Sequence, residues 1–259
     1  MTRTIYQGAT GTKEWATSNV NFLNGCQHAC KYCYAKAMVP RHGSMDINKW
    51  DTPEIKPGAL DKGFRKREGT IMFPSVHDIH PDNLDDAVRI LKKLLEPGND
   101  VLIVSKPHKK CINRLCKELS IFQKQILFRF SIGSSANKVL RFWEPNAPRF
   151  AERLASLKHA HQKGFQTSVS CEPMLDDRID KVIEAVEDFV SDTIWIGRLN
   201  NGMRYCKING HGNFETIAAI RQLEEWQSPE NIFKLYKKYK KHPKIKWKDS
   251  IRRVLEIRG

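Results

Sequence analysis

The segment from Asn24 to Ala37 reads NGCQHACKYCYAKA and holds Cys26, Cys30 and Cys33 at the spacing C-x3-C-x2-C. Three neighbouring thiols add little to packing, whereas thiolates are strong ligands for zinc and for iron–sulfur clusters. The chain has seven cysteines, an odd number, and its first residues include no apolar leader. A metal site is therefore favoured over a disulfide framework.

Two kinds of metal site fit this spacing. A structural zinc ion needs a fourth ligand, for which His28 and His42 are available, although the spacing is uncommon for zinc. An iron–sulfur cluster held by three cysteines instead leaves one iron open to a small molecule. The cysteines directly follow an apolar segment at 19–23 that is a predicted strand. A loop in that position favours the open cluster, because it can face a binding cavity.

The elements that must position these cysteines alternate between strands and helices. Helical patterns occur at 84–95, 112–119, 149–163 and 179–189, and the six predicted strands are 19–23, 70–75, 100–107, 126–132, 165–174 and 193–199. Alternation of this kind predicts a parallel sheet of βαβ units. Six units are too few for a closed eightfold barrel, so we expect an α/β fold, a partial (β/α)6 TIM-like barrel. Its chemistry should lie at the carboxyl ends of the strands.

The remainder of the chain is strongly basic. Residues 1–200 are predicted to form the barrel, and residues 201–259 a basic helical C-terminal extension packed on it. The formal net charge is +15, and residues 230–259 carry about half of the excess, with Phe233, Tyr236, Tyr239 and Trp247 among the lysines. This stretch is either a solvated helical face or a surface for a polyanion such as nucleic acid. No segment is long enough to span a bilayer, so a soluble cytoplasmic protein is expected.

Together, the cysteine spacing and the barrel pattern resemble the radical S-adenosylmethionine (SAM) superfamily. Further stretches resemble its spore photoproduct lyase-like branch over about 19–200, and they occur in the order CKYCYA, SVHD, VLIVSKP, SI, EPNAPRFAERLASLKHAHQKGF and EPM. The resemblance implies an enzyme in which Cys26, Cys30 and Cys33 bind a 4Fe-4S cluster. SAM would chelate the open iron and be cleaved reductively to a 5′-deoxyadenosyl radical that abstracts hydrogen. An electron donor such as flavodoxin or ferredoxin is implied as a partner.

Matching the family's motifs residue by residue also implies where SAM is held. Lys106, after the third predicted strand, matches the position that contacts the SAM carboxylate, and Arg153 is a second candidate. His77 and Asp78 follow the second strand, where the superfamily binds the amino group. Ser131, at the end of the fourth strand, matches a ribose or carboxylate contact. Each could instead be an ordinary strand-end or helix-surface residue.

Aromatic and cysteine positions complete the implied site. Tyr32, between two cysteines, matches the residue that packs on adenine, and the backbone at Gly197 matches the adenine edge. Spore photoproduct lyase carries a hydrogen-donating cysteine after its second strand, whereas this chain has PSVHD there. The difference argues against thymine-dimer repair by that route. Cys171 and Tyr34 are alternative members of a radical relay, although a free cysteine is usually just a small buried apolar residue.

The charge and the resemblance together predict that the radical attacks a nucleic-acid base, in modification or repair. Two alternatives stay open. One is a radical SAM enzyme acting on a peptide or small metabolite, which is weakened because no cysteine-rich C-terminal domain follows the barrel pattern. The other is a non-catalytic nucleic-acid-binding protein that holds zinc or a cluster.

Overall fold

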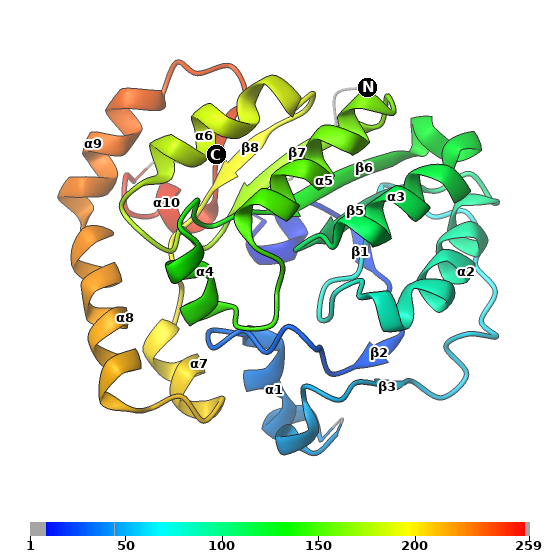
Figure 1. Ribbon diagram of the computed structural model, residues 1–259, viewed down its shortest axis with the longest axis horizontal. Coiled ribbons are helices and arrows are strands. Elements are labelled where there is room, and N and C mark those ends of the chain that lie inside the picture. Colours follow the sequence, from blue (N-terminus) through cyan, green and yellow to red (C-terminus); the bar gives the residue numbers. More distant parts are fainter. Residues whose placement is uncertain (1–8, 44, 257–259) are drawn as a thin grey trace.

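The sheet at the centre of the molecule is wholly parallel and does not close on itself (Figure 1). The computed structural model describes residues 9–43 and 45–256. The strand order β1-β4-β5-β6-β7-β8-β9 leaves β1 and β9 at the two edges. The strands are β1 (Ser18–Asn19), β4 (Thr70–Phe73), β5 (Asp100–Ser105), β6 (Ile126–Ser131), β7 (Gln166–Cys171), β8 (Ile194–Ile196) and β9 (Ile245–Trp247). The predicted α/β partial barrel is confirmed.

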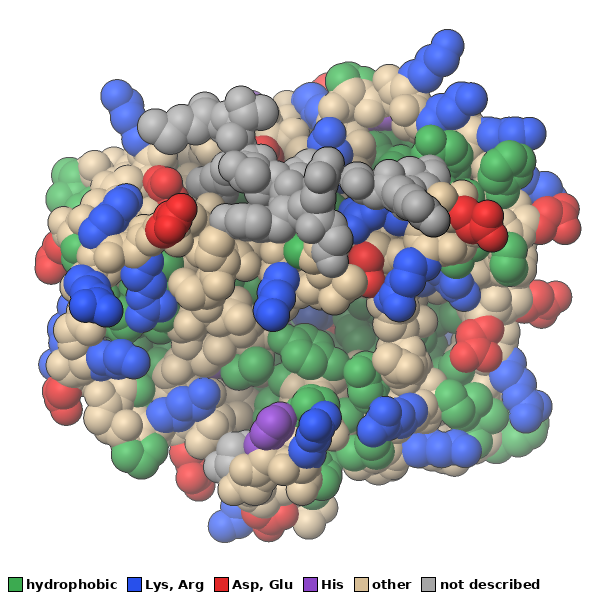
Figure 2. All heavy atoms as spheres, turned by 180° about the vertical axis from the view of Figure 1, so that it is seen from behind, with side chains coloured by type: hydrophobic (Ala, Val, Ile, Leu, Met, Phe, Trp, Pro, Cys, Tyr) green, Lys and Arg blue, Asp and Glu red, His purple; other side chains and the backbone are tan. Residues whose placement is uncertain are grey.

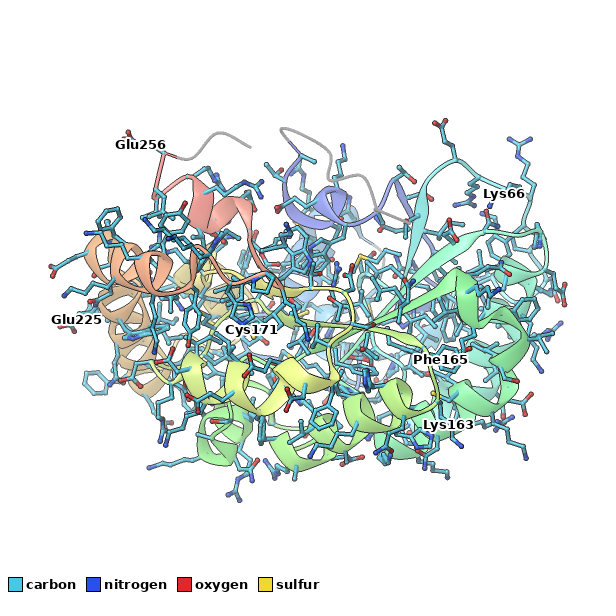
Figure 3. The ribbon with its side chains drawn as sticks, turned by 90° about the horizontal axis from the view of Figure 1, so that it is seen from above. Lys66, Lys163, Phe165, Cys171, Glu225 and Glu256 are labelled. Carbon is cyan, nitrogen blue, oxygen red and sulfur yellow. The ribbon has the colours of Figure 1, made fainter. Side chains whose placement is uncertain are left out.

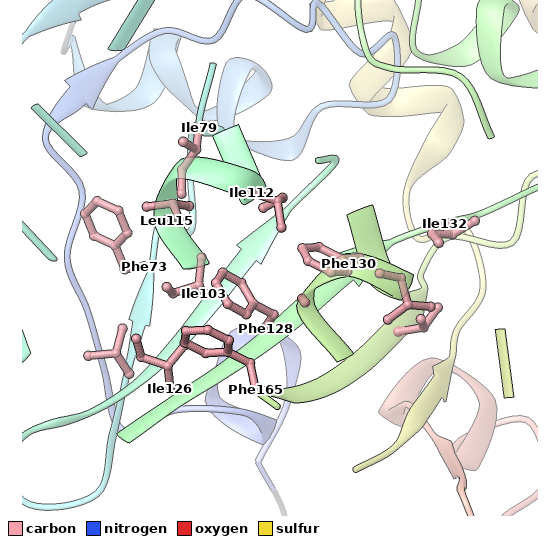
Figure 4. Packing of buried hydrophobic residues seen from close by; sticks show 14 of the residues in the cluster. Phe73, Ile79, Ile103, Ile112, Leu115, Ile126, Phe128, Phe130, Ile132 and Phe165 are labelled. Atoms are coloured by element: carbon pink, nitrogen blue, oxygen red, sulfur yellow. The ribbon is translucent and has the colours of Figure 1, made fainter. Parts of the chain in front are cut away.

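Helices cover the outer face of this sheet, because each strand is joined to the next by a crossover helix. On α2 (Leu84–Leu95) the buried residues Leu84, Val88, Leu91 and Leu95 recur at helical spacing and form the stripe that faces the sheet. The other covering helices are α3 (Lys109–Glu118), α5 (Phe150–Gln162) and α6 (Ile179–Val186). In contrast, α4 (Asn137–Trp143) packs Leu140 and Trp143 into a second cluster that includes Cys206 of α7 and Ile220 of α8. Figure 4 shows the resulting core, in which phenylalanines of β6 pack beside Phe165 and aliphatic residues of β5 and α3.

The predicted first strand at 19–23 is divided into two short strands. Its beginning is β1, which pairs with β4 in the main sheet. Its end is β2 (Leu23–Asn24), which pairs antiparallel with β3 (Glu54–Ile55) outside that sheet. The chain then enters the cysteine loop and α1 (Tyr34–His42). This separate two-stranded pair closes off the segment that contains the cysteine loop, which lines the cavity at the carboxyl ends of the strands.

The C-terminal region contributes a strand to the barrel as well as helices. After α7 (Gly202–Ile208), α8 (Phe214–Trp226) and α9 (Pro229–Tyr239), strand β9 pairs in parallel with β8, and α10 (Asp249–Arg252) follows. The predicted boundary between residues 200 and 201 therefore divides strands of one sheet, a feature that the sequence did not predict. The outermost residues of both predicted domains, 1–8 and 257–259, lie outside the described residues.

Most aromatic residues of the basic stretch serve packing. The rings of Tyr236 and Trp247 lie 5.4 Å apart, and the Tyr239 hydroxyl donates a hydrogen bond of 2.6 Å to Asp180. Phe233 is exposed, with the Lys237 ammonium 4.6 Å from its ring centroid. On the face seen in Figure 2, Lys and Arg side chains are spread widely and do not gather in one patch. None of the described helices has the length and apolar character needed to cross a bilayer.

Candidate active site at the carboxyl ends of the strands

A cavity of about 1080 Å³ lies at the carboxyl ends of the parallel strands. One side is lined by Cys26, Cys30 and Cys33, and the middle by residues that end β4, β5, β6 and β7. The other side is lined by an N-terminal segment, by residues that follow β8, and by residues that follow β9. This is the edge of an α/β barrel at which ligands bind.

The cysteine loop is held at both of its ends by hydrogen bonds that involve backbone amides. The Cys26 amide donates to the Trp50 carbonyl at 2.7 Å. Gly25, just before it, has a φ of +92°, and a Cβ there would lie 2.6 Å from the same carbonyl oxygen. At the other end, Cys33 is the N-cap of α1, and its sulfur accepts from the Lys36 amide at 3.4 Å. The loop conformation is therefore fixed by the chain around it.

A Gly25→Ala variant is expected to be less stable by about 2 kcal/mol or more, because left-handed backbone and the overlap with Trp50 both oppose a side chain there. It should also incorporate less iron, since Cys26 is the next residue. Chemical denaturation and iron analysis measure the two effects. Gly63→Ala is the matched control, because no atom lies within 4 Å of a Cβ at that position. Equal behaviour of the two variants would contradict the assigned role of Gly25.

The three thiols line one cavity together. Within residues 9–43 and 45–256, no three His, Cys, Asp or Glu side chains are grouped so that they could hold a single metal ion. His28, a possible zinc ligand, has both ring nitrogens engaged: Nδ1 lies 3.2 Å from an Asp78 oxygen and Nε2 lies 3.0 Å from His108 Nε2. The thiols share one cavity with a cation, Lys106, beside them. Three thiolates are a donor set that would fit an iron–sulfur cluster.

Asp78 connects the cysteine loop to two strand ends. Besides His28, its carboxylate accepts hydrogen bonds from the Ser105 hydroxyl, from the Lys106 amide at 2.8 Å and from the Ile79 amide at 2.8 Å. Burial alone would raise the pKa of Asp78, but His28, Lys106 and the Ser105 hydrogen bond together hold it well below its ordinary value. Asp78 is therefore an anion that is saturated with protein donors.

The side chain of the neighbouring His77 is bonded to backbone groups. Its Nε2 accepts from the Phe22 amide at 3.2 Å, and its Nδ1 lies 3.3 Å from the Asp78 carbonyl oxygen. Burial lowers the pKa of His77 to about 4, so the ring is neutral. The structure brings both residues to the cavity, as the sequence predicted, but their side chains mainly hold the loop and the strand ends together.

Lys106 belongs to a buried charged cluster with Tyr32, Glu144 and Arg153. The Tyr32 hydroxyl donates to Glu144 Oε1, the Arg153 guanidinium lies 2.5 Å from Glu144 Oε2, and the Lys106 ammonium lies 3.8 Å from Glu144 Oε1. Burial opposes ionisation of Glu144, but Arg153 and Lys106 lower its pKa below the ordinary value. Although burial disfavours the Lys106 cation, Cys30, Glu144 and Asp78 raise its pKa. Lys106 thus presents a firmly charged ammonium to the cavity.

Two predicted SAM contacts do not line the cavity. Arg153 is fully buried, and besides Glu144 it donates to the carbonyls of Pro148 at 2.8 Å and Ser131 at 3.1 Å. Gly197 donates its amide to the Cys171 carbonyl at 3.2 Å and accepts from the Met174 amide at 3.0 Å. Ser131, by contrast, lines the cavity. Arg153 and Gly197 therefore hold the segments that line the cavity and do not line it themselves.

The two predicted relay residues have different surroundings. Tyr34 lines the cavity, and its hydroxyl donates to the Ser75 carbonyl at 2.5 Å. Cys171 is fully buried in the core cluster, near the middle of the molecule (Figure 3), and does not line the cavity. Its strand neighbours Ser170 and Glu172 do line it. The relay role of Cys171 stays a prediction, and its position gives that role no support.

Several residues of the site were missed by reasoning from the sequence. Glu172 follows β7, so the rule that strand ends carry chemistry would have selected it. Glu144 follows α4, and Lys248 belongs to a lysine-rich run, yet both are buried. No local signal distinguishes a buried charge from an exposed one, because its partners come from distant segments.

The chain resembles known proteins in both sequence and fold. A model of the Radical SAM superfamily matches residues 20–190. Uncharacterized protein ORF301 of Acidianus two-tailed virus is 27% identical over 186 residues, which are 67% of this chain and 60% of that protein. Uncharacterized protein MJ0683 of Methanocaldococcus jannaschii is 24% identical over 167 residues, which are 62% of this chain and 61% of that protein. The chain thus spans less than two thirds of the length of either relative.

Solved structures with a similar fold include a spore photoproduct lyase complexed with dinucleoside spore photoproduct, with a TM-score of 0.56, 15% identity, and coverage of 82% of this chain and 64% of that one. Streptococcus suis SuiB bound to S-adenosylmethionine gives a TM-score of 0.53, 13% identity, and coverage of 92% of this chain and 51% of that one. The superfamily model covers well over half of the chain, including the cysteine loop and β4 to β7. The chain therefore belongs to the radical SAM superfamily.

Proposed function

We propose that this protein is a radical SAM enzyme whose substrate is a base of a nucleic acid. The observation that carries the first half is the placement of Cys26, Cys30 and Cys33 on one cavity, with the Lys106 ammonium beside them. When bound, a reduced 4Fe-4S cluster and SAM supply a 5′-deoxyadenosyl radical that abstracts hydrogen. The protein's own residues place these groups, set their electrostatics and exclude water.

In this proposal Lys106 holds the SAM carboxylate, because its ammonium faces the cavity next to Cys30 and its charge is secured by nearby anions. Ser131 offers a hydroxyl to the ribose, and the Tyr32 ring lies in the wall where adenine would pack. Asp78 and His77 keep the loop against the strand ends. Glu144 bonds to Lys106 and Tyr32, and Arg153 bonds to the end of β6. These two residues therefore position the groups that contact SAM and do not contact SAM themselves.

A nucleic-acid substrate is supported by the net charge of +15 and by Lys13, Arg198 and Arg253 in the cavity wall. The base would have to leave its stack to enter the cavity. A flavodoxin or ferredoxin is the proposed source of the electron. The similar spore photoproduct lyase structure is complexed with dinucleoside spore photoproduct, and SuiB has also been solved bound to a precursor peptide. A peptide is therefore the alternative that the experiment must separate.

The test is anaerobic reconstitution with iron and sulfide, followed by SAM and dithionite, with 5′-deoxyadenosine as the product measured. We expect a brown protein that forms 5′-deoxyadenosine, and binding of short single-stranded oligonucleotides that weakens steeply as salt is raised. A colourless protein with stoichiometric zinc would refute the enzymatic proposal. A brown, SAM-cleaving protein that binds no oligonucleotide would refute the nucleic-acid substrate alone.

A further inference from the structure

The side of the cavity opposite the cysteines has a polar centre of its own. Glu172, just after β7, projects there with a fifth of its side chain exposed, and Oε2 lies 3.3 Å from the Lys248 ammonium. Lys248 also contacts Glu14 at 2.9 Å and the Gly11 carbonyl at 2.8 Å. An ammonium has three donors. All three are used within the protein, so Lys248 fixes Glu172 and has none left for a ligand.

Ser170 shares this wall with Glu172. Residues two apart on a strand face the same side of a sheet, so Ser170 and Glu172 both point away from the core that holds Cys171. Ser170 is only 1% exposed and lines the cavity, and its hydroxyl is an orphan among the described residues. Its register partner on β6 is Ser131. A buried hydroxyl without a partner on a cavity wall indicates a missing ligand group.

Close packing holds the Glu172 side chain in place. A Cβ at Gly197 would lie 2.8 Å from Glu172 Cγ, so only glycine permits this approach of β8. Glu172 and Tyr34, which belongs to the cysteine side, line the same cavity. Burial, then the charges of Cys33 and Glu172, raise the pKa of the Tyr34 phenol. A group bound to Glu172 would therefore lie between the cysteine loop and the segment that follows β9.

The chemistry of this wall selects a particular kind of base. Burial raises the pKa of Glu172 to about 7, although Lys248 acts in the opposite direction, so Glu172 is mostly an ionised carboxylate, and only an acceptor of hydrogen bonds, above that pH. No donor of Lys248 is free beside it. The N3–H of thymine or uracil lies between two carbonyl oxygens, which a carboxylate would repel. The amino groups of adenine, cytosine and guanine present donors without that penalty. Glutamate accepting from such an amino group is a known mode of base readout.

From this geometry, and resting on the proposed function, we infer that Glu172 and Ser170 form the substrate-recognition wall, with Glu172 accepting a hydrogen bond from the amino group of a base. Glu172 is thus a specificity-determining residue for adenine, cytosine or guanine over thymine and uracil. Lys248 is a positioning residue that acts through Glu172.

The experiment compares the wild-type protein with Glu172→Gln, which keeps the packing against Gly197 but removes the charge. Short oligo(dA), oligo(dC) and oligo(dT) are the probes, used at about pH 8 so that Glu172 is ionised. The readouts are affinity and deuterium transfer from deuterated oligonucleotide into 5′-deoxyadenosine. Wild type should favour oligo(dA) or oligo(dC) over oligo(dT) by about tenfold, and Glu172→Gln should lose that preference, because a charge-assisted hydrogen bond is removed.

Glu225→Gln is the matched control, because Glu225 is an exposed acid at the outer edge of the molecule (Figure 3). It should keep the wild-type preference. Equal binding of all three probes by the wild-type protein, or an unchanged preference in Glu172→Gln, overturns the inference while leaving the proposed function intact. If no oligonucleotide binds wild-type protein that cleaves SAM, the nucleic-acid proposal fails, and this inference fails with it.

Discussion

Replacing Cys30 with alanine is expected to leave a folded protein that retains little iron after reconstitution and forms no 5′-deoxyadenosine. Cys30 is the middle of the three thiols and lines the cavity between Cys26 and Cys33. Burial raises the pKa of its thiol well above the ordinary value, with the Lys106 cation acting in the opposite direction. A thiol that titrates so high contributes as a metal ligand and not as a free nucleophile, so its loss should remove the cluster and cost little stability.

Iron and sulfide content, the visible absorption of the cluster and circular dichroism measure these effects together. Cys116→Ala is the matched control, because Cys116 is a buried cysteine of α3 and does not line the cavity. It should retain iron and SAM cleavage. Full iron content in Cys30→Ala would show that the cluster is held elsewhere and would remove the basis of the proposed function.

Replacing Glu144 with glutamine should lower the free energy of unfolding by about 3 kcal/mol, because it leaves Arg153 buried without its anion. Both side chains are nearly inaccessible to water, Arg153 at 0% and Glu144 at 2% exposure. The Tyr32 hydroxyl also loses its anionic acceptor, and Lys106 loses one of the charges that secure its ammonium. Denaturant unfolding measures the stability.

The double variant Glu144→Gln with Arg153→Met distinguishes the interaction between the two side chains from the separate contribution of each to stability. If the cost comes from an uncompensated buried cation, adding Arg153→Met should recover part of the lost stability. A further loss that simply adds to the first would mean that Glu144 and Arg153 stabilise the fold independently. The single variant should also weaken SAM binding, since Lys106 and Tyr32 both depend on Glu144 for their positions.

Regular elements with many local signals were predictable from the sequence. The helix at 84–95 and the strands that became β4, β5 and β6 have apolar patterns strong enough to set their type and nearly their ends. Strand β9 was missed because it holds only three residues, one of them Lys246, inside a run of lysines. Its pairing with β8 depends on tertiary contacts that no local pattern records.

The candidate site was predictable to a similar degree. The cysteine spacing and the strand-end rule identified Cys26, Cys30, Cys33 and Lys106, all of which line the cavity. Neither the cysteine spacing nor the strand-end rule indicates whether a charged side chain is buried. From the sequence, Arg153 was expected to be either a helix-surface residue or a contact to SAM. Its buried partner Glu144 lies at the end of α4, and no role was predicted for Glu144 itself. Charged residues are seldom buried, so these pairs become visible only once distant segments are brought together.

The contact between Lys248 and Glu14 has a consequence for how the molecule folds. These residues are separated by most of the chain, and they join the segment after β9 to the segment before β1. Ordering such distant segments costs more entropy than pairing neighbouring strands, and it is compensated only when the strands between them are in place. We therefore expect the βαβ units from β4 to β7 to assemble first. The side of the cavity that contains Lys248 should be completed late, so partly folded molecules are expected to order the strands β4 to β7 before the contacts of Lys248 with Glu14 and Glu172 form.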